Sequence, residues 1–430
     1  MASFRDLELW RQLRAPAPAL LLAAIALVFI RARDQPSVGV AFGSTTASIT
    51  PQDVLLVLLA GVALARLGRR RPERALWPVA ATGLALCLLI VGSAIPNGST
   101  AFVSGSKLVE LAALTLGVIA IVRTRAQIEA IVDVLLLFTI AADVVGVVVF
   151  LADGGGRQSA FLGEHDFAAL ATLPLVYGLA LLFEPRPRIG RGLVAAGAGS
   201  LGCILGAALA SLAGFYLAVL VLLLVGLLRH RLTRLGVVTA LVAVGLVTGG
   251  TLTLRANDLG FLQALAGTKP SRPGQFASSW SQRLIYAYVG GRIFLAHPVL
   301  GTGWYGDPPP STFASFIPAA RRRFSDQPPR YFPPTTTPFI PQMWWDEVLY
   351  ELGIVGGVAM LAVLVALAGA CRRAASAAAD WTGLLPATWL AATIGALAGE
   401  GLFGGTPLAA TFWVVAGVIA VSPLLSEGTP

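Results

Sequence analysis

The sequence predicts an all-α polytopic membrane protein, with about 12 transmembrane helices and one large extracytoplasmic loop between helices 9 and 10. Three observations predict this class. The chain of 430 residues is 56% hydrophobic and only 12% charged, about half the charge of a typical soluble domain. Apolar segments long enough to cross a bilayer recur along it, and arginine gathers in alternate connections between them.

The apolar segments give the expected helices, of which the first and the eleventh are the shortest. They lie at residues 15–30, 51–66, 76–95, 107–122, 126–152, 167–183, 193–210, 212–228, 235–254, 348–370, 383–398 and 406–424. The first run follows three arginines, as in a signal peptide, but "RARDQP" comes after it instead of small residues. We therefore expect an uncleaved first helix.

The arginine-rich connections predict the orientation. The stretches 66–75, 123–125, 184–191, 229–234 and 371–373 join the segments in alternate connections, and with the N-terminal arginines they hold more than half of the 31 Lys and Arg. Short cytoplasmic loops carry such an excess, so we expect both termini in the cytoplasm of a multi-pass membrane protein. This topology also explains the net charge of +9, and we expect no nucleic-acid partner.

The expected organisation has three parts. Residues 1–254 hold helices 1 to 9, residues 255–345 form the extracytoplasmic loop, and residues 346–430 hold helices 10 to 12. The loop contains "SWSQRLIYAYVGGRIFLAH" (279–297), where apolar residues recur at helical spacing, so we expect an amphipathic helix lying on the bilayer. The following stretch, 306–339, is too rich in proline for regular structure.

The stretch "RQSAFLGEHDFAAL" (157–170) gathers Arg157, Glu164, His165 and Asp166 at the start of helix 6. The acids suit a helix N-terminus, where the dipole favours negative charge. The alternative is a site for a polar head group, in which His165 moves protons near neutral pH.

A basic cluster, Arg321, Arg322 and Arg323, lies in the loop. It suits contact with solvent or anionic lipid, or an anion clamp for a phosphate or an acidic glycan. Within helices, Glu110 has Lys107 as a candidate partner. The three cysteines lie in or beside apolar runs without metal-ligand spacing, and we expect no metal and no cofactor.

The stretch "PQMWWDEVLYELGIVGG" (341–357) places Asp346 and Glu347 at the mouth of helix 10. Adjacent helical residues point about 100° apart, so we expect one acid to cap the helix or face solvent. The other faces a cavity under Trp344 and Trp345, whose rings exclude water and offer an apolar surface for stacking. We favour Asp346 as a general base, then Glu347, then His165.

Three segments, in this order, resemble the O-antigen ligase and polymerase family of C-type glycosyltransferases. They are "RQSAFLGEHDFAALATLPL", "SWSQRLIYAYVGGRIFLAHPVLGTGWYG" and "EVLYELGIVGG". The resemblance implies that Arg283 contacts the donor phosphate. A second family arginine follows a serine where this chain has Ser211 and then Leu212, and the family's histidine falls on Gln342. Candidates to take over phosphate binding are Arg157, Arg292 and the arginines of the loop cluster.

The family resemblance also implies the activity. It implies a metal-independent glycosyltransferase that moves a glycan from a polyprenyl-diphosphate-linked donor to an envelope glycan, lipid or protein on the extracytoplasmic face. The partners would be this donor, the acceptor and membrane lipid, and the enzyme would be a ligase or a polymerase. A non-enzymatic transporter of polysaccharide or lipid, or a scaffold subunit of a glycan assembly complex, stays open as an alternative.

Overall fold

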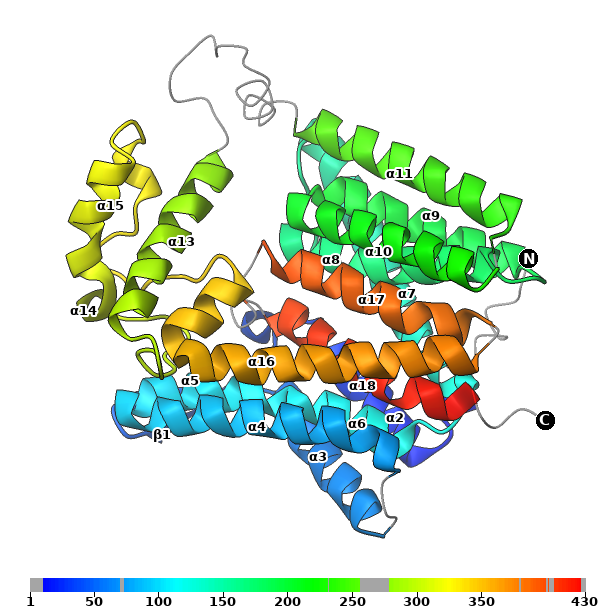
Figure 1. Cartoon of the computed structure of the whole chain (residues 1–430), viewed down its shortest axis with the longest axis horizontal. Coiled ribbons are helices and arrows are strands. Elements are labelled where there is room, and N and C mark those ends of the chain that lie inside the picture. The colour runs from blue at the N-terminus through cyan, green and yellow to red at the C-terminus, as the bar shows by residue number, and fades with distance from the viewer. Residues whose placement is uncertain are drawn as a thin grey trace.

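The computed structural model describes residues 11–69, 73–230, 232–255, 278–378, 380–399, 401 and 406–426. This part of the chain is a bundle of long helices (Figure 1). Ten spans within it are long and apolar enough to cross a membrane. They are formed by α3 (Pro51–Arg69), α4 (Trp77–Ala94), α5 with α6 (Ser99–Glu110 and Ala112–Ile121), α7 (Arg125–Ala152), α8 (Glu164–Leu182), α9 (Ile189–Gly206), α10 (Leu209–Leu228), α11 (Arg234–Leu254), α16 (Trp344–Ala377) and α18 (Thr406–Ser426).

Two further apolar helices are shorter, namely α2 (Pro16–Val28) and α17 (Trp381–Leu397). They coincide with the first and eleventh expected segments. The structure therefore agrees with an all-α polytopic membrane protein, while the count of twelve membrane crossings stays a prediction.

Local sequence sets several helix ends. Thr124 and Gln127 form a capping box at the start of α7, which satisfies N–H groups that the first turn leaves open. α16 begins at Trp344, four residues before the expected segment, and runs for 34 residues. It is broken at Gly353, whose φ of 64° and ψ of −159° are not helical. Glycine adopts this backbone without a Cβ clash.

Small residues bring neighbouring helices close together. A Cβ at Gly178 of α8 would lie 2.5 Å from the Gly192 carbonyl oxygen of α9. A Cβ at Gly214 of α10 would lie 2.5 Å from the Ala392 carbonyl oxygen of α17. Such backbone contact is a usual way for membrane helices to pack. In Figure 1, α9 to α11 lie on one side of α16 to α18, and α3 to α6 on the other.

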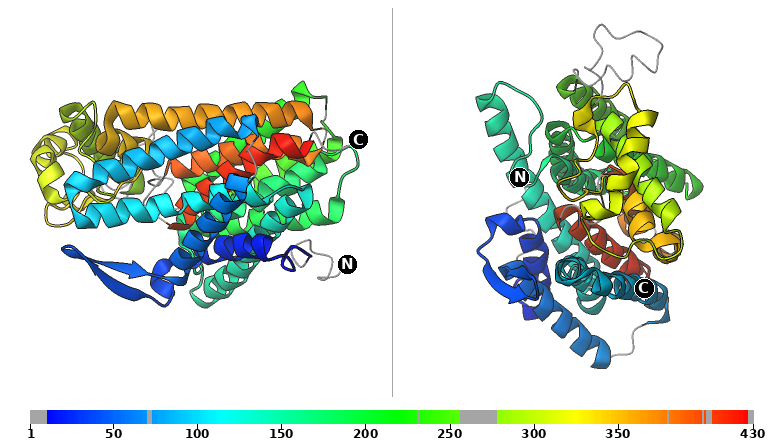
Figure 2. Two further views of the ribbon diagram at one scale, coloured as in Figure 1. Left: turned by 90° about the horizontal axis from the view of Figure 1, so that it is seen from below. Right: turned by 90° about the vertical axis from the view of Figure 1, so that its left-hand side faces the viewer.

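Residues 278–343, which precede α16, fold as a lobe at one end of the bundle (Figure 2). It contains α13 (Ser278–Ala296), α14 (Pro310–Phe313), α15 (Ile317–Arg323) and two short 3-10 helices, Ala314–Phe316 and Pro329–Tyr331. The expectation of no regular structure in 306–339 is therefore wrong. Proline occupies the first turn of α14, α15 and the 3-10 helix Pro329–Tyr331, where its missing N–H costs nothing.

The lobe has an aromatic core of its own. Ile285, Val289 and Ile293 of α13 face this core, together with Phe313 and Phe339. The opposite side of α13 carries Leu284 and Leu295, which are exposed. From the sequence we expected the apolar side of this helix to lie on the bilayer. Residues 256–277 of the expected loop lie outside the described residues.

A β-hairpin extends from the same end of the bundle (Figure 2). Strands β1 (Val38–Phe42) and β2 (Thr45–Ile49) pair antiparallel around a Gly43–Ser44 turn. Val38 pairs with Ile49, and the side chains of both are exposed.

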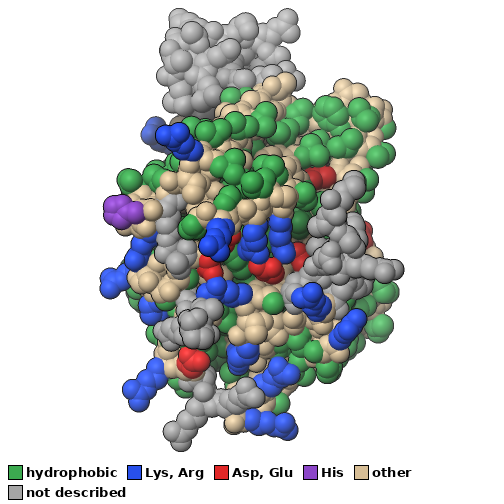
Figure 3. Space-filling view, turned by 90° about the vertical axis from the view of Figure 1, so that its right-hand side faces the viewer, with side chains coloured by type: hydrophobic (Ala, Val, Ile, Leu, Met, Phe, Trp, Pro, Cys, Tyr) green, Lys and Arg blue, Asp and Glu red, His purple; other side chains and the backbone are tan. Residues whose placement is uncertain are grey.

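The opposite end of the bundle carries many charged side chains (Figure 3). There Arg188 lies 2.6 Å from Glu129, Arg191 lies 2.7 Å from Asp133, and Arg125 pairs with Asp380. These arginines belong to the connections that the sequence assigned to the cytoplasm.

Candidate functional site

The start of α8 lies among three arginines from separate segments. His165 interacts electrostatically with Arg283 of α13, Arg157 of the preceding loop and Arg255 at the end of α11. We call Arg157, Arg255 and Arg283 the arginine cluster. Because the three residues are far apart in sequence, their meeting at one place is a property of the fold.

Carbonyl oxygens at helix C-termini hold each of these guanidinium groups. Arg157 donates to the Gly206 oxygen at 3.3 Å, and Arg255 to the Ala207 oxygen at 3.0 Å. Both acceptors end α9, where Ala207 adopts a left-handed conformation. Arg283 donates twice to the oxygen of Gly399, just past α17, at 2.8 and 3.2 Å. Helix C-termini carry partial negative charge, so these contacts orient the three guanidinium groups.

The two acids beside His165 make structural contacts. Glu164 forms an ion pair of 2.6 Å with Arg157. The Asp166 carboxylate accepts a 3.0 Å hydrogen bond from the Leu408 backbone N–H, in the first turn of α18. Asp166 therefore satisfies the start of α18, although it belongs to α8.

Both acids that open α16 are buried. Asp346 is 4% exposed and Glu347 is 0% exposed. We expected one of them to cap α16 or to face solvent, and the expectation of a solvent-facing acid is wrong. The Asp346 carboxylate packs against Gly290 of α13, where a Cβ would lie 2.3 Å from its Oδ2. The Glu347 carboxylate lies against Gly401, in the connection from α17 to α18.

A third acid of α16 has a structural role. Glu351 is fully buried, and its Oε1 accepts the backbone N–H groups of Tyr305 at 3.3 Å and Gly306 at 3.0 Å. It thereby holds the "GTGWYG" turn against the helix. Asp307 follows in this turn, and burial raises the pKa of its carboxyl group above the usual range.

The connection from α17 to α18 joins the arginine cluster to the acids. Arg283 binds the oxygen of Gly399, and two residues later Gly401 contacts Glu347. The cluster and the Glu347 carboxylate thus flank one short stretch of backbone at the lobe end of the bundle.

Other candidates lie apart from this arrangement. Arg292 is exposed on α13, and Arg321, Arg322 and Arg323 are exposed on α15. Arg321 lies over the ring of Phe332, 5.9 Å from its centroid. Trp345 is 42% exposed, whereas Trp344 is half-buried against the main core. Gln342 is half-buried in the approach to α16.

Sequence reasoning did not single out Arg255 as a site residue. The signal was its position, since it directly follows the ninth apolar segment, on the side expected to be extracytoplasmic. In the structure, Arg255 contacts the turn at Ala207. Ala207 lies four residues before Ser211, the position after which the family resemblance led us to look for an arginine.

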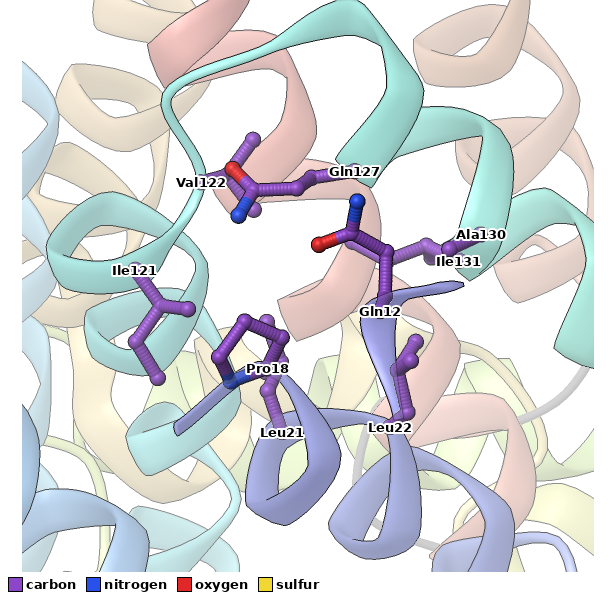
Figure 4. Close-up of a pocket in the computed structure, with 9 residues that line it drawn as sticks. All are labelled: Gln12, Pro18, Leu21, Leu22, Ile121, Val122, Gln127, Ala130 and Ile131. Atoms are coloured by element: carbon purple, nitrogen blue, oxygen red, sulfur yellow. The ribbon is translucent and has the colours of Figure 1, made fainter. Parts of the chain in front are cut away.

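A small pocket at the opposite end of the bundle has a different character (Figure 4). Its lining contains no titratable side chain, and the amides of Gln12 and Gln127 face it. Among the described residues, no group of three or more His, Cys, Asp or Glu is placed to hold a metal ion.

These features define a class, a multi-pass helical membrane protein with an arginine cluster and buried carboxylates at one end. Residues 193–361 match the family model described as O-Antigen ligase, which confirms the resemblance over that stretch. The match includes Arg255, Arg283, Asp346 and Glu347, and it implies a membrane glycosyltransferase-like ligase or polymerase activity. No curated protein matches the chain.

Proposed function

We propose that this chain transfers a glycan from a polyprenyl-diphosphate-linked donor to an acceptor hydroxyl at the lobe end of the bundle. We assign that end to the extracytoplasmic face of a bacterial inner membrane. The observation that carries the proposal is that three arginines donate to backbone oxygens around the turn between α9 and α10. There Gly206 lies against the Glu164 backbone and Gly399 against Ala210, while Glu347 lies against the nearby Gly401.

The arginine cluster suits the diphosphate of the donor. Guanidinium groups bind phosphate oxygens through two parallel hydrogen bonds. Helix C-terminal carbonyls already orient all three groups. Cations fixed in this way stabilise the negative charge that grows on the leaving diphosphate, and they do so without reorganising.

In the proposed step, the acceptor hydroxyl oxygen attacks the anomeric carbon of the donor sugar. The bond from that carbon to the diphosphate oxygen breaks, and its electron pair leaves with the diphosphate. A carboxylate takes the hydroxyl proton. The contact of Glu347 with Gly401, beside the Arg283 contact, supports Glu347 ahead of Asp346 as this base.

The donor site is tested by Arg283→Ala, assayed as purified protein with lipid-linked donor. We expect transfer to fall by about a hundredfold, as when one transition-state donor is removed. Arg283→Lys keeps the charge but loses the planar fork, so it should be impaired too. Arg292→Ala, an exposed arginine on the same helix, is the matched control. Full transfer by Arg283→Ala would overturn the donor site.

The base is tested by Glu347→Gln and Asp346→Asn, separately and together. We expect Glu347→Gln to lower the rate by about a hundredfold or more, with Asp326→Asn, an exposed acid of the lobe, as control. Unchanged rates in both amides, combined with loss of activity in His165→Ala, would move the base to α8. Donor binding without any transfer in the wild-type chain would favour a transporter or scaffold.

A further inference from the structure

A second feature is formed by α3 to α6, which lie on the other side of α16 to α18 from α9 to α11 (Figure 1). Helices α3, α4, α5 and α6 line a groove of about 990 Å³, with Val363 of α16 and Trp413 of α18 also lining it. The lining is almost wholly apolar. Val57 and Leu84, on opposite walls, are more than half exposed, so the groove opens on the side surface of the bundle.

The groove has the length of a lipid chain. It runs along α5 and α6 at least from Ser106 to Ile119, which is roughly 20 Å at 1.5 Å per residue. That is about two-thirds of a 30 Å hydrocarbon core. A chain lying in the groove would therefore run parallel to the membrane-spanning helices.

One end of the groove is polar. Asp53, Lys107 and Glu110 all line it. Lys107 pairs with Asp53, which also accepts the Thr50 N–H at 2.7 Å. Glu110 lies against the same Asp53 carboxylate, and its Oε1 is buried without a hydrogen-bond partner.

The charges at this end select the headgroup. The one lysine among the lining residues is already paired with Asp53 and lies beside a second acid, so it is poorly placed to bind a phosphate. The Glu110 Oε1 atom, in contrast, needs a donor. A hydroxyl-bearing, uncharged headgroup supplies that donor without bringing a negative charge. The diphosphate of the proposed donor does not fit here, whereas it fits the arginine cluster.

The β-hairpin continues the apolar surface beyond this end. Ile49 of β2 lines the groove, and its partner Val38 is exposed. On its other side, α5 touches the turn that Glu351 holds, because Gly105 packs against Trp304. Only one helix therefore separates the headgroup end from that turn.

We propose that this groove is a site for an uncharged glycolipid, whose apolar chains lie along α3 to α6 and whose hydroxyl groups donate to Glu110. The site is separate from the transfer site and does not depend on its activity. Phospholipid and polyprenyl diphosphate are the occupants that the acidic end disfavours.

The test is direct lipid binding to the purified full chain, measured by native mass spectrometry. The probes are diglucosyl-diacylglycerol and phosphatidylglycerol with the same acyl chains. We expect the glycolipid to be retained in preference. Ala80→Phe, which fills the groove, should abolish this retention, whereas Ala213→Phe on the exposed side of α10 should not.

The headgroup contact is tested by Glu110→Gln. The amide removes the charge that disfavours phosphatidylglycerol, so the preference should fall by about tenfold. Equal retention of both lipids by the wild-type chain would overturn the proposal, and so would retention that Ala80→Phe does not change. Either result would show that the bound lipid is non-selective boundary lipid. Tighter retention of phosphatidylglycerol would overturn the charge argument and the proposal with it.

Discussion

Two arginines at the charged end of the bundle, which we call the paired end, differ in their partners from two arginines at the lobe end. At the end shown in Figure 3, Arg188 and Arg191 both reach the Glu129 carboxylate, at 2.6 and 3.1 Å. At the lobe end, Arg255 and Arg283 donate to backbone carbonyl oxygens that close α9 and α17. Carboxylates cancel the charge of an arginine, whereas carbonyl groups orient it and leave the charge in place.

The two kinds of partner suit different roles, one in stability and the other in ligand binding. Half-buried ion pairs bind elements together, because removing one partner leaves a charge that must be desolvated alone. Guanidinium groups oriented by backbone oxygens suit an anionic ligand. We therefore expect substitutions at the paired end to affect mainly stability, and substitutions at the lobe end to affect the proposed transfer.

The largest expected effect is an all-or-none labelling pattern that tests which end faces outward. Cysteine in place of Ser311, which is exposed in the lobe, should react with an impermeant thiol reagent in intact cells. Cysteine in place of Gly190, at the paired end, should not. The three native cysteines are buried, which keeps the background low. The reverse pattern would overturn both the topology and the compartment of the reaction.

The next effect is on stability. Glu129→Ala removes the shared partner of Arg188 and Arg191, so we expect a loss of about 2 to 3 kcal/mol of unfolding free energy. Glu164→Ala, whose partly exposed carboxylate pairs with Arg157 at the lobe end, should cost less than about 1 kcal/mol. Thermal unfolding in detergent measures both. Equal losses would contradict the contrast between the ends.

A smaller effect is expected on transfer. Arg255→Ala should lower the rate by about tenfold or more with lipid-linked donor, and Arg255→Lys should recover part of it. Arg229→Ala is the matched control, since Arg229 ends α10 at the paired end as Arg255 ends α11. Transfer that falls equally in both variants would show a structural cause and remove Arg255 from the donor site.

The smallest effect concerns pH. Burial raises the pKa of Asp307, so the folded state holds this proton more tightly than the unfolded state. Stability from this group is therefore fully present below the unfolded pKa and is lost as pH rises through the folded pKa. Asp307→Asn should remove that loss, giving a higher unfolding midpoint than the wild-type chain at pH 7 but not at pH 3. An identical pH profile in both would contradict the assignment.

Much of the membrane part could be predicted from the sequence, because hydropathy and arginine spacing act locally. Segments such as 126–152 coincide with α7 almost to the residue. The β-hairpin was missed, although Val38, Val40 and Phe42 recur at every second position before Gly43–Ser44, a turn signal for a hairpin. That signal is short, and both faces of the hairpin lie outside any predicted core.

The candidate site could be predicted only in part. Asp346, Glu347, Arg283 and His165 were named from local motifs, but their surroundings come from contacts across the chain. Burial of both acids of α16 depends on Gly290 and Gly401, and neither contact is visible in the local pattern. Arg255 joins the cluster through Ala207, 48 positions earlier in the chain.

The break in α16 has a consequence for how the chain is made. Past Gly353, the N–H groups of Ile354 and Val355 bond to the oxygens of Pro298 and Val299, at 2.8 and 3.2 Å. These acceptors are synthesised before α16 and sit on the lobe that precedes it. Domains generally fold from the N-terminal side during synthesis, so we expect these acceptors to be present when α16 emerges. The break would then close onto backbone that the chain has already made.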